Sequence, residues 1–297
     1  MRILLIYYTG TYNTRYLTER LSDLLASHGH AVTRVEVRCD TPKIPIDHYD
    51  LVGIGYPIYG FNCPAPLERY LARLAFPQGQ RYFIYKNSGE TYAMNNASSR
   101  ILLRRFNRAG CVFRGEYHFV MPYNIHFRFE DDFVRELLDK DEKLLAVMVR
   151  NLERGKVVGI RSSLLCNLGA SVVAIQKIGG SINSFFYRVD REACTGCGLC
   201  VRDCPEKNIR KDKHGRIVFG HRCDMCMRCS FLCPENAIRI GFLEGWRVNG
   251  AYPLDRLREA GPPEQPYITE ESRGFFSCFP AFYRAVDEAY REAFPEE

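Results

Sequence analysis

Eight cysteines lie in two runs of identical spacing. The runs CTGCGLCVRDCP, from Cys194, and CDMCMRCSFLCP, from Cys223, both follow C-x2-C-x2-C-x3-C-P, and the second begins 29 residues after the first. Soft thiolates suit iron and sulfide, and this spacing is the bacterial 4Fe-4S pattern. The internal repeat therefore predicts a module with pseudo-twofold symmetry that carries two 4Fe-4S clusters.

The fourth cysteine of each run is expected to serve the cluster of the other run, as is usual in this pattern. The predicted ligand sets are Cys194, Cys197, Cys200 and Cys233 for one cluster, and Cys223, Cys226, Cys229 and Cys204 for the other. Such a module has few large apolar residues, so cluster binding should supply most of its folding free energy. The alternative is a pair of zinc sites, but zinc loops usually pair two C-x2-C units across a longer gap.

The residues before these runs alternate between strand and helix patterns. Strand-like apolar runs occupy about residues 2–8, 31–37, 49–60, 80–89 and 111–124, and helical patterns occupy about 15–29, 65–75, 95–110 and 131–154. Strands alternating with helices predict an α/β doubly wound parallel sheet, here with about five strands.

Three polar or aromatic loops follow strands of this sheet, at residues 9–14, 57–62 and 87–92. Ligands bind at the carboxyl ends of such strands. The first loop offers hydroxyls, an amide and free backbone N–H groups at the start of a helix, which suits a phosphate monoester. The second offers Tyr59 for stacking on a flat ring, and the third offers N–H groups near Ser88 and Gly89 with Tyr92 behind them. Together they predict a flavin mononucleotide (FMN) site.

The first loop, TGTYNT, resembles the flavodoxin pattern T/S-x-T-G-x-T. The whole chain resembles the EFR-type ferredoxin family, in which a flavodoxin-like domain is fused to a two-cluster ferredoxin in anaerobic bacteria. The resemblance implies that the first loop holds the FMN phosphate and that Tyr59 lies beside the isoalloxazine. The predicted cofactor residues are Thr9, Gly10, Thr11, Asn13, Thr14, Pro57, Tyr59, Gly60, Asn87, Ser88, Gly89 and Tyr92.

One residue departs from the flavodoxin pattern. Tyr12 stands where flavodoxins have glycine, and a left-handed backbone conformation is costly for tyrosine. The alternative that the chain binds no flavin therefore stays open. Asn13 and Thr14 could instead cap the following helix, and Tyr59 and Tyr92 could be ordinary surface aromatics. His118 and His126 receive no role.

Four parts are predicted along the chain: a flavodoxin-like domain over residues 1–155, a connector over 156–186, a small α+β two-cluster ferredoxin-like domain over 187–242, and a C-terminal extension over 243–297. The connector is rich in Val, Leu and Ile, which predicts that it docks the two modules together, unlike a free tether. An apolar stripe on the last helix, about residues 279–294, favours a clamp on the flavodoxin-like domain over a partner site.

Composition limits the partners and the compartment. The 13 cysteines, without a recognisable signal peptide, indicate reduced thiols and a cytoplasmic protein. The longest apolar stretch, residues 164–175, is far short of the ~20 residues that cross a bilayer, so no membrane span is expected. The formal charge of +6 falls to roughly +2 once thiolates and clusters are counted, and it indicates no nucleic-acid partner.

The expected function is electron transport: an electron carrier that relays electrons between FMN and two 4Fe-4S clusters, with a low-potential redox protein as donor or acceptor. No G-x-G-x-x-G motif follows a strand, which disfavours a self-contained NAD(P)H oxidoreductase. Two alternatives stay open. One is an iron-sulfur flavoprotein oxidoreductase that reduces a small substrate with electrons from the clusters. The other is a flavin-free docking platform that carries a ferredoxin.

Overall fold

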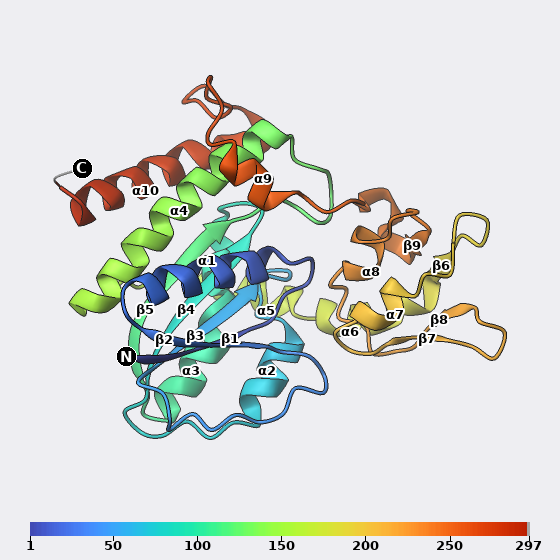
Figure 1. Ribbon diagram of the computed structural model, residues 1–297, viewed down its shortest axis with the longest axis horizontal. Coiled ribbons are helices and arrows are strands. Elements are labelled where there is room, and N and C mark those ends of the chain that lie inside the picture. Colours follow the sequence, from blue (N-terminus) through green and yellow to red (C-terminus); the bar gives the residue numbers. More distant parts are fainter. Residues whose placement is uncertain (296–297) are drawn as a thin grey trace.

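The largest sheet contains five parallel strands in the order β2-β1-β3-β4-β5 within residues 1–295, which the computed structural model describes (Figure 1). The strands are β1 (Arg2–Tyr7), β2 (Ala31–Glu36), β3 (Leu51–Pro57), β4 (Arg81–Ser88) and β5 (Val112–Val120). This order defines the flavodoxin-like class of doubly wound sheets. The predicted fold class is confirmed.

The inner strands are buried on both faces. β1 is buried from Ile3 to Tyr7, and β3 is buried from Leu51 to Tyr56. Continuous apolar runs are typical of parallel strands that helices cover on both sides, whereas the edge strand β2 keeps exposed positions. The apolar runs in the sequence therefore correspond to the middle of the sheet.

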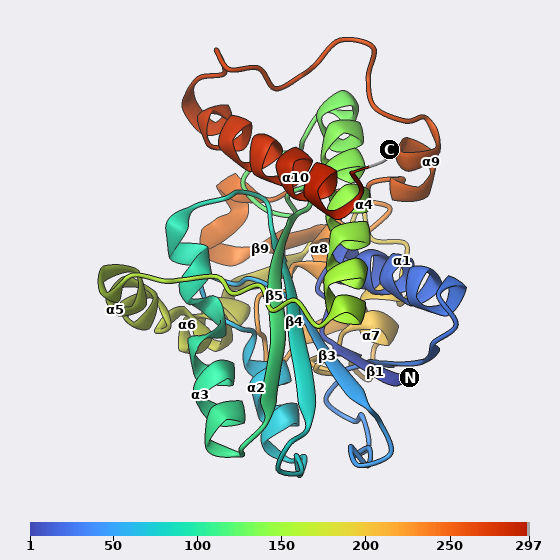
Figure 2. The same ribbon diagram turned by 90° about the vertical axis from the view of Figure 1, so that its left-hand side faces the viewer.

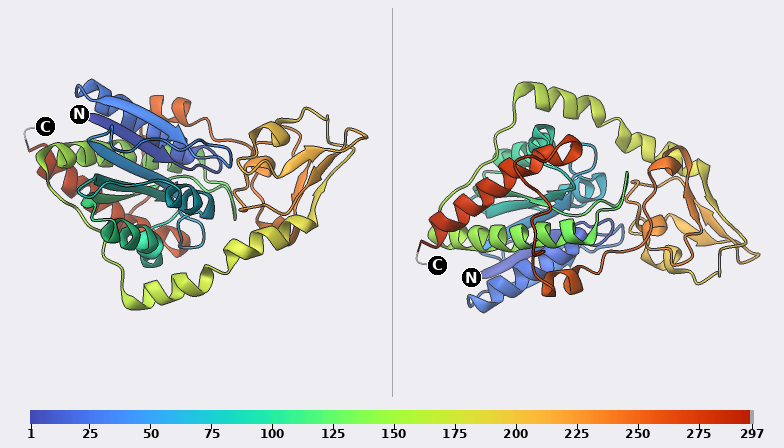
Figure 3. Two further views of the ribbon diagram at one scale, coloured as in Figure 1. Left: turned by 90° about the horizontal axis from the view of Figure 1, so that it is seen from below. Right: turned by 90° about the horizontal axis from the view of Figure 1, so that it is seen from above.

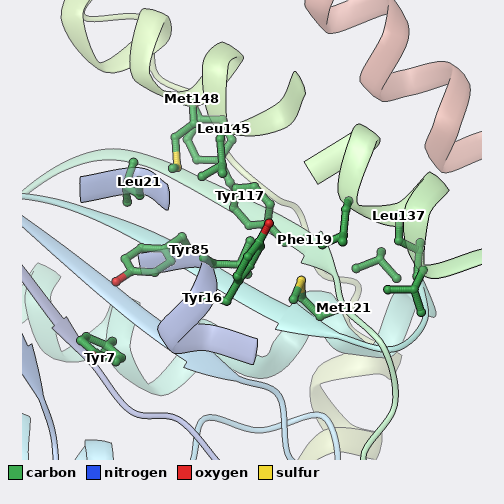
Figure 4. Close-up of a cluster of buried hydrophobic side chains, with 14 of the residues drawn as sticks. Tyr7, Tyr16, Leu21, Tyr85, Tyr117, Phe119, Met121, Leu137, Leu145 and Met148 are labelled. Carbon is green, nitrogen blue, oxygen red and sulfur yellow. The ribbon is translucent and has the colours of Figure 1, made fainter. Parts of the chain in front are cut away.

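Helices form a layer on each face of the sheet (Figure 2). One face is covered by α1 (Asn13–Ser27) and α4 (Asp131–Arg154), and the other by α2 (Ala65–Ala72) and α3 (Arg100–Arg108). Figure 4 shows the core under α1 and α4, where Tyr85, Phe119 and Leu145 are buried together. This core holds the sheet rigid, so that the loops at its carboxyl edge have a fixed base.

The cysteine runs form a small module at that edge (Figure 1). β6 (Tyr187–Val189) pairs antiparallel with β9 (Ile238–Ile240), and β7 (Ile209–Lys211) pairs antiparallel with β8 (Ile217–Phe219). The short helices α7 (Leu199–Asp203) and α8 (Arg228–Phe231) start 29 residues apart, as do β7 and β9. The repeat in sequence is thus a repeat in structure.

The C-terminal extension returns to the flavodoxin-like domain. It contains a 3₁₀-helix (Gly241–Trp246), α9 (Leu254–Glu259), a second 3₁₀-helix (Gly274–Cys278) and α10 (Phe279–Ala293). Helix α10 lies across α4 and buries Phe279, Tyr283 and Val286. Lys140 of α4 and Asp287 of α10 form an ion pair at 2.7 Å. These contacts favour the interpretation of the last helix as a clamp on the flavodoxin-like domain.

The connector forms an arm on the outside of the molecule (Figure 3). It consists of α5 (Leu164–Val173), α6 (Gln176–Asn183) and a 3₁₀-helix (Ser184–Phe186). The prediction that its apolar residues dock the modules is wrong for the outer side, where Leu164 is 84% and Ile175 74% exposed. Small and polar residues make the inner contacts, because only they fit against the loops beneath.

The arm also corrects the expected limit of the apolar segment. The helical stretch continues past Ile175 to Phe186, and by length and composition Leu164–Phe186 is the one segment of the described chain that could cross a membrane. One such segment is weak evidence for a membrane span.

Candidate redox site

The eight cysteines surround two cavities. Cys194, Cys197, Cys200 and Cys233 line a cavity of about 260 Å³, which we call the first cysteine cavity. Cys204, Cys223, Cys226 and Cys229 line a smaller one of about 30 Å³, the second cysteine cavity. Cys204 and Cys229 also line the first cavity, so the assignment of four cysteines to each cluster, with the fourth cysteine of each run exchanged, stays a prediction.

The arrangement of these side chains bears on the kind of metal centre. Among residues 1–295, no three His, Cys, Asp or Glu side chains converge as the ligands of a single metal ion would. Around the cavities, burial raises the pKa of Cys200 to about 11 and that of Cys223 to about 12. Thiolates there need a positively charged centre, which a metal ion or an iron-sulfur cluster supplies.

The two cysteine runs share their backbone conformation as well as their cysteine spacing. Gly196 and Gly198 have φ values of 71° and 78°, and their counterparts Met225 and Met227 have φ values of 48° and 60°. This left-handed conformation costs methionine on the order of 1–2 kcal/mol. The second loop keeps the same backbone conformation despite that cost, which indicates that the site requires this conformation.

Backbone amides also approach the sulfurs in both halves. The N–H of Asn208 donates to Cys204 Sγ at 3.3 Å, and the N–H of Ala237 donates to Cys233 Sγ at 3.3 Å. A hydrogen bond to a thiolate favours its charged form. The fourth cysteine of each run thus receives the same backbone hydrogen bond.

A third cavity, of about 750 Å³, lies at the carboxyl ends of β1, β3 and β4, and we call it the strand-end cavity. All but one of the predicted cofactor residues line it: Thr9, Gly10, Thr11, Asn13, Thr14, Pro57, Tyr59, Gly60, Asn87, Ser88 and Gly89. Tyr92 does not line it and is 46% exposed, because the chain turns into a 3₁₀-helix (Ala93–Ser99) directly after it. Its expected place is taken by Tyr123, whose ring lies against Gly89.

The first loop of this cavity can receive an anion. Helix α1 begins at Asn13, and its N-cap residue Tyr12 makes no side-chain cap hydrogen bond in the described structure. The first N–H groups of the helix are therefore free to bind an anion. The Thr9 hydroxyl is buried without a hydrogen-bond partner in residues 1–295. These donors fit a phosphate group.

Asn13 and Thr14 are not caps, contrary to the alternative weighed for them. They lie in the first turn of α1, where the Asn13 side-chain amide donates to the Pro122 carbonyl at 2.8 Å. The Thr14 hydroxyl donates to Asn87 Oδ1 at 2.7 Å. These bonds tie the start of α1 to the last residues of β4 and to the loop after β5, so the polar groups around the cavity form one network.

Tyr12 does adopt the left-handed conformation, with φ of 75°. Its ring borders the first cysteine cavity and is absent from the lining of the strand-end cavity. The guanidinium carbons of Arg15 and Arg228 lie 4.3 and 4.8 Å from the ring centre. These cation–π contacts offset part of the backbone cost, and they hold the ring away from the position that a phosphate would take.

Arg228 connects the cysteine module to the loop after β1, a role that no sequence motif predicts. It stands between two cysteines of the second run and is 1% exposed. Its Nε donates to the Gly10 carbonyl at 2.6 Å and its Nη2 to the Thr9 carbonyl at 2.6 Å. In a trans peptide the C=O and the next N–H point in opposite directions. Arg228 thus turns the N–H groups of Gly10 and Thr11 away from the cysteine module.

The three cavities follow one another in space. The strand-end cavity shares Asp224 and Met227 with the second cysteine cavity. The second shares Cys204, Arg228 and Cys229 with the first. Since no described residue lines both the strand-end cavity and the first cysteine cavity, the second cysteine cavity lies between them.

Two tyrosines with buried hydroxyls lie at the junction of the strand-end and second cysteine cavities. Tyr59 lines the former and Tyr8 the latter, with ring centres 6.2 Å apart and the rings edge to face. Tyr59 reaches back to the first loop, so a Cβ on Gly10 would overlap its hydroxyl. Both hydroxyls lack a hydrogen-bond partner within residues 1–295. They are therefore available to a bound group.

Several residues of the strand-end cavity come from segments outside the three loops predicted to hold the cofactor. His126 and Trp246 line it, with ring centres 5.1 Å apart, and the His126 N–H donates to the Trp246 carbonyl at 2.8 Å. Tyr123 donates a short hydrogen bond to Glu90. Gln176 closes the cavity from the connector. The aromatic run after β5, residues 123–129, was the one available signal.

Comparison with known proteins gives the class of the cysteine module. Residues 193–238 match the family of 4Fe-4S dicluster domains. An uncharacterized ferredoxin from Methanocaldococcus jannaschii is 40% identical over 57 residues, which are 18% of this chain and 73% of that protein. Pyruvate synthase subunit PorD from the same organism is 33% identical over 66 residues, 22% of this chain and 77% of that protein. Through this segment the chain belongs to the ferredoxins with a 4Fe-4S dicluster domain.

Among solved structures, the general stress protein 14 of Treponema denticola in complex with FMN aligns with 52% of this chain and 99% of its own, at 17% identity and a TM-score of 0.38. The flavodoxin-like fold itself follows from the strand order. A flavodoxin-like domain joined to a 4Fe-4S ferredoxin domain gives the chain an electron-transfer role.

Proposed function

We propose that this chain is an electron carrier that relays electrons between an FMN in the strand-end cavity and two 4Fe-4S clusters, one in each cysteine cavity, with the architecture of the EFR-type ferredoxins. The observation that carries the proposal is the series of three cavities, in which each cavity shares lining residues with the next. When bound, a flavin exchanges one or two electrons and each cluster exchanges one. The cluster held by Cys204, Cys223, Cys226 and Cys229 is then the one next to the flavin.

The residues of the strand-end cavity suit the parts of FMN. The Thr9 hydroxyl and the N–H groups at the start of α1 bind the phosphate. Tyr59 and Tyr123 supply aromatic surface for the ring, and the N–H groups near Ser88 and Gly89 supply donors for its carbonyls. Arg228 keeps the first loop in position from the ferredoxin side.

The far end of the relay is open to a partner. Cys197, in the first cysteine cavity, is exposed. We propose that a redox protein docks there as donor or acceptor, in a cytoplasmic setting that keeps thiols reduced. The proposed domains keep their bounds of 1–155, 156–186, 187–242 and 243–297.

A second candidate is an iron-sulfur flavoprotein oxidoreductase that reduces a small substrate. The observation in its favour is that His126, Trp246 and Gln176 extend the strand-end cavity beyond the three flavin loops. A steady-state screen with reduced ferredoxin and small aromatic acceptors distinguishes the two, because a carrier without a substrate site turns over none of them.

Anaerobic purification followed by quantitation of FMN, iron and acid-labile sulfide on one sample tests the proposal. We expect about one FMN, about eight iron atoms and about eight sulfides per chain. Iron and sulfide at those levels without flavin, even after incubation with FMN, would overturn the flavin half and leave a docking platform that carries a ferredoxin.

A further inference from the structure

The outer side of the connector carries a continuous apolar stripe. Along Leu164–Phe186 the exposed apolar side chains recur every three or four residues, so they share one helical face. At a rise of 1.5 Å per residue, α5 with 10 residues is about 15 Å long and α6 with 8 residues is about 12 Å long. The α5–α6 stripe comprises Leu164, Leu165, Leu168, Val172, Ile175, Ile178, Ile182, Phe185 and Phe186, which are 43% to 84% exposed.

Residues on the inner side of the same arm form hydrogen bonds and an ion pair with the rest of the protein. Asn62 donates to the Ala170 carbonyl at 2.9 Å, Lys177 pairs with Glu68 at 2.7 Å, and Asn183 donates to the Ile240 carbonyl at 3.0 Å. The arm is thus fixed to both modules, while no segment within residues 1–295 covers its outer side. A contiguous apolar surface of this size marks a binding surface.

Unpaired positive charge lies beside the stripe. Helix α3 runs on the same side of the molecule as α5 and α6 (Figure 2), and Arg100 of α3 donates to Ser171 of α5 at 3.2 Å. Four arginines of α3 and one in the segment before α5 make no ion pair with any residue of 1–295: Arg100, Arg104, Arg105, Arg108 and Arg161. The sequence has no Asp or Glu from residue 154 to residue 189.

Exposed aromatics mark the ferredoxin end of the stripe. Phe242 is 72% and Trp246 52% exposed, and the rings of Phe186 and Phe242 lie 4.3 Å apart. Aromatic side chains with one wet and one apolar environment are enriched at membrane–water interfaces. A long apolar ridge with unpaired arginines beside it and aromatics at its end has the composition of an interfacial anchor.

We propose that the α5–α6 stripe docks this protein on the surface of an anionic lipid bilayer. The arm projects from the molecule (Figure 3), and a bilayer accepts the apolar side of such an arm without a matching groove, whereas a protein partner must supply one. The arginines then lie at the level of anionic headgroups. The arm lies on the bilayer and does not cross it, because crossing would break the Lys177–Glu68 pair and the Asn183 contacts.

This orientation places the electron-transfer site close to the lipid. Val173, Gln176 and Gly179 of the arm line the strand-end cavity from the inside. The cavity and the bilayer are therefore separated by one helix, whose diameter with side chains is about 10–12 Å.

Flotation of the full-length, cluster-loaded protein with vesicles tests the proposal. We expect it to float with vesicles of phosphatidylcholine and phosphatidylglycerol in equal parts, and to float far less with phosphatidylcholine alone or at high salt. The double variant Leu168→Glu/Ile175→Glu should weaken binding about ten-fold or more, since both side chains are exposed in the free protein. Arg104→Gln should weaken it about five-fold.

The control is Ala285→Glu, which places the same charge on an exposed position of α10 and should bind vesicles as the wild type does. An unchanged cluster spectrum in all variants shows that folding is intact. Failure of the wild type to bind anionic vesicles would overturn the proposal. So would a concentration-dependent dimer, seen by light scattering and abolished by Leu168→Glu/Ile175→Glu without any effect on vesicle binding, because a second copy would then cover the stripe.

Discussion

At the residue scale, the most specific prediction concerns the buried tyrosine hydroxyls at the junction of the strand-end and second cysteine cavities. Tyr8 borders the second cysteine cavity, and its hydroxyl has no hydrogen-bond partner in the described chain. Hydrogen bonds to the sulfurs of a cluster favour its reduced, more negative form and so raise its potential. Tyr8→Phe should therefore lower the midpoint potential of the second cluster by about 30–60 mV, the equivalent of about 1 kcal/mol for one electron.

Redox titration followed by electron paramagnetic resonance measures this shift for each cluster. Tyr56→Phe is the matched control, because Tyr56 is equally buried but contacts Ser98 and borders neither cysteine cavity. Equal shifts in both clusters, or none in the Tyr8 variant, would show that the hydroxyl does not reach the second cluster.

The position of Tyr12 gives a prediction about FMN affinity. Because its ring lies outside the strand-end cavity, Tyr12→Gly should leave the dissociation constant of FMN within about two-fold, although it relieves a left-handed tyrosine. Fluorescence titration of the flavin-stripped protein measures this constant. An affinity that rises ten-fold or more would mean that the ring obstructs the phosphate.

His118 gives a pH dependence. Burial, with a smaller effect of the Lys86 charge, lowers its pKa from 6.5 to about 3. Between those pH values the unfolded chain binds a proton that the folded chain does not, so the free energy of unfolding falls as the pH drops below about 6.5. His118→Gln removes this pH dependence. The difference in the free energy of unfolding between wild type and variant should therefore change by about 2 kcal/mol from pH 6.5 to about pH 5.

Anaerobic urea unfolding at a series of pH values measures that gap. Above about pH 7 the plots of the free energy of unfolding against pH should run parallel for wild type and variant, because His118 is then neutral in both the folded and the unfolded chain. Parallel curves throughout the lower range would show that His118 is protonated in the folded protein.

At the element scale, the link between α8 and the loop after β1 is the critical contact. Arg228 is buried, and truncating a buried charged donor leaves its acceptors unpaired at a cost of about 3–5 kcal/mol. Arg228→Leu should therefore reduce FMN affinity at least ten-fold and make the chain between the modules sensitive to protease. Arg210→Leu, at an exposed position of β7, is the control and should change neither property. Wild-type FMN affinity in the Arg228 variant would mean that the phosphate loop holds its shape unaided.

The elements themselves could largely be predicted from the sequence. Buried strands such as β3 read as continuous apolar runs, and the helix α4 has the predicted bounds, because both patterns depend on local periodicity. The direction of Tyr92 could not be predicted, since it depends on where a 3₁₀-helix begins. Arg228 was missed for a related reason: its partners, Thr9 and Gly10, are more than 200 residues away, and no local pattern records such a pair.

The connector is a second case in which the sequence alone could not predict the contacts. Its apolar content predicted burial, but composition does not say which side of a helix faces the protein, and polar contacts such as Lys177 with Glu68 decided it. The periodicity of the stripe was present in the sequence and could have indicated an amphipathic helix with a free face.

At the scale of the whole molecule, several contacts fix the two modules to each other. Cys39 N–H donates to the Pro205 carbonyl at 2.9 Å, Lys207 pairs with Asp40 at 2.7 Å, and Arg69 pairs with Glu206 at 2.9 Å. These bonds lie around the second cysteine cavity, next to the Arg228 contact. A fixed interface keeps the strand-end cavity and the two cysteine cavities in one order, so electron transfer along them requires no movement of the modules.

The most direct test of this account is a flash-reduction experiment on the fully loaded protein under anaerobic conditions, in which one electron is delivered to the flavin and the flavin and cluster absorbances are followed in time. The account predicts that cluster reduction follows flavin oxidation at a rate that does not change with protein concentration, because the electron moves within one chain. A rate proportional to protein concentration, or flavin that keeps its electron while the clusters stay oxidised, would contradict it.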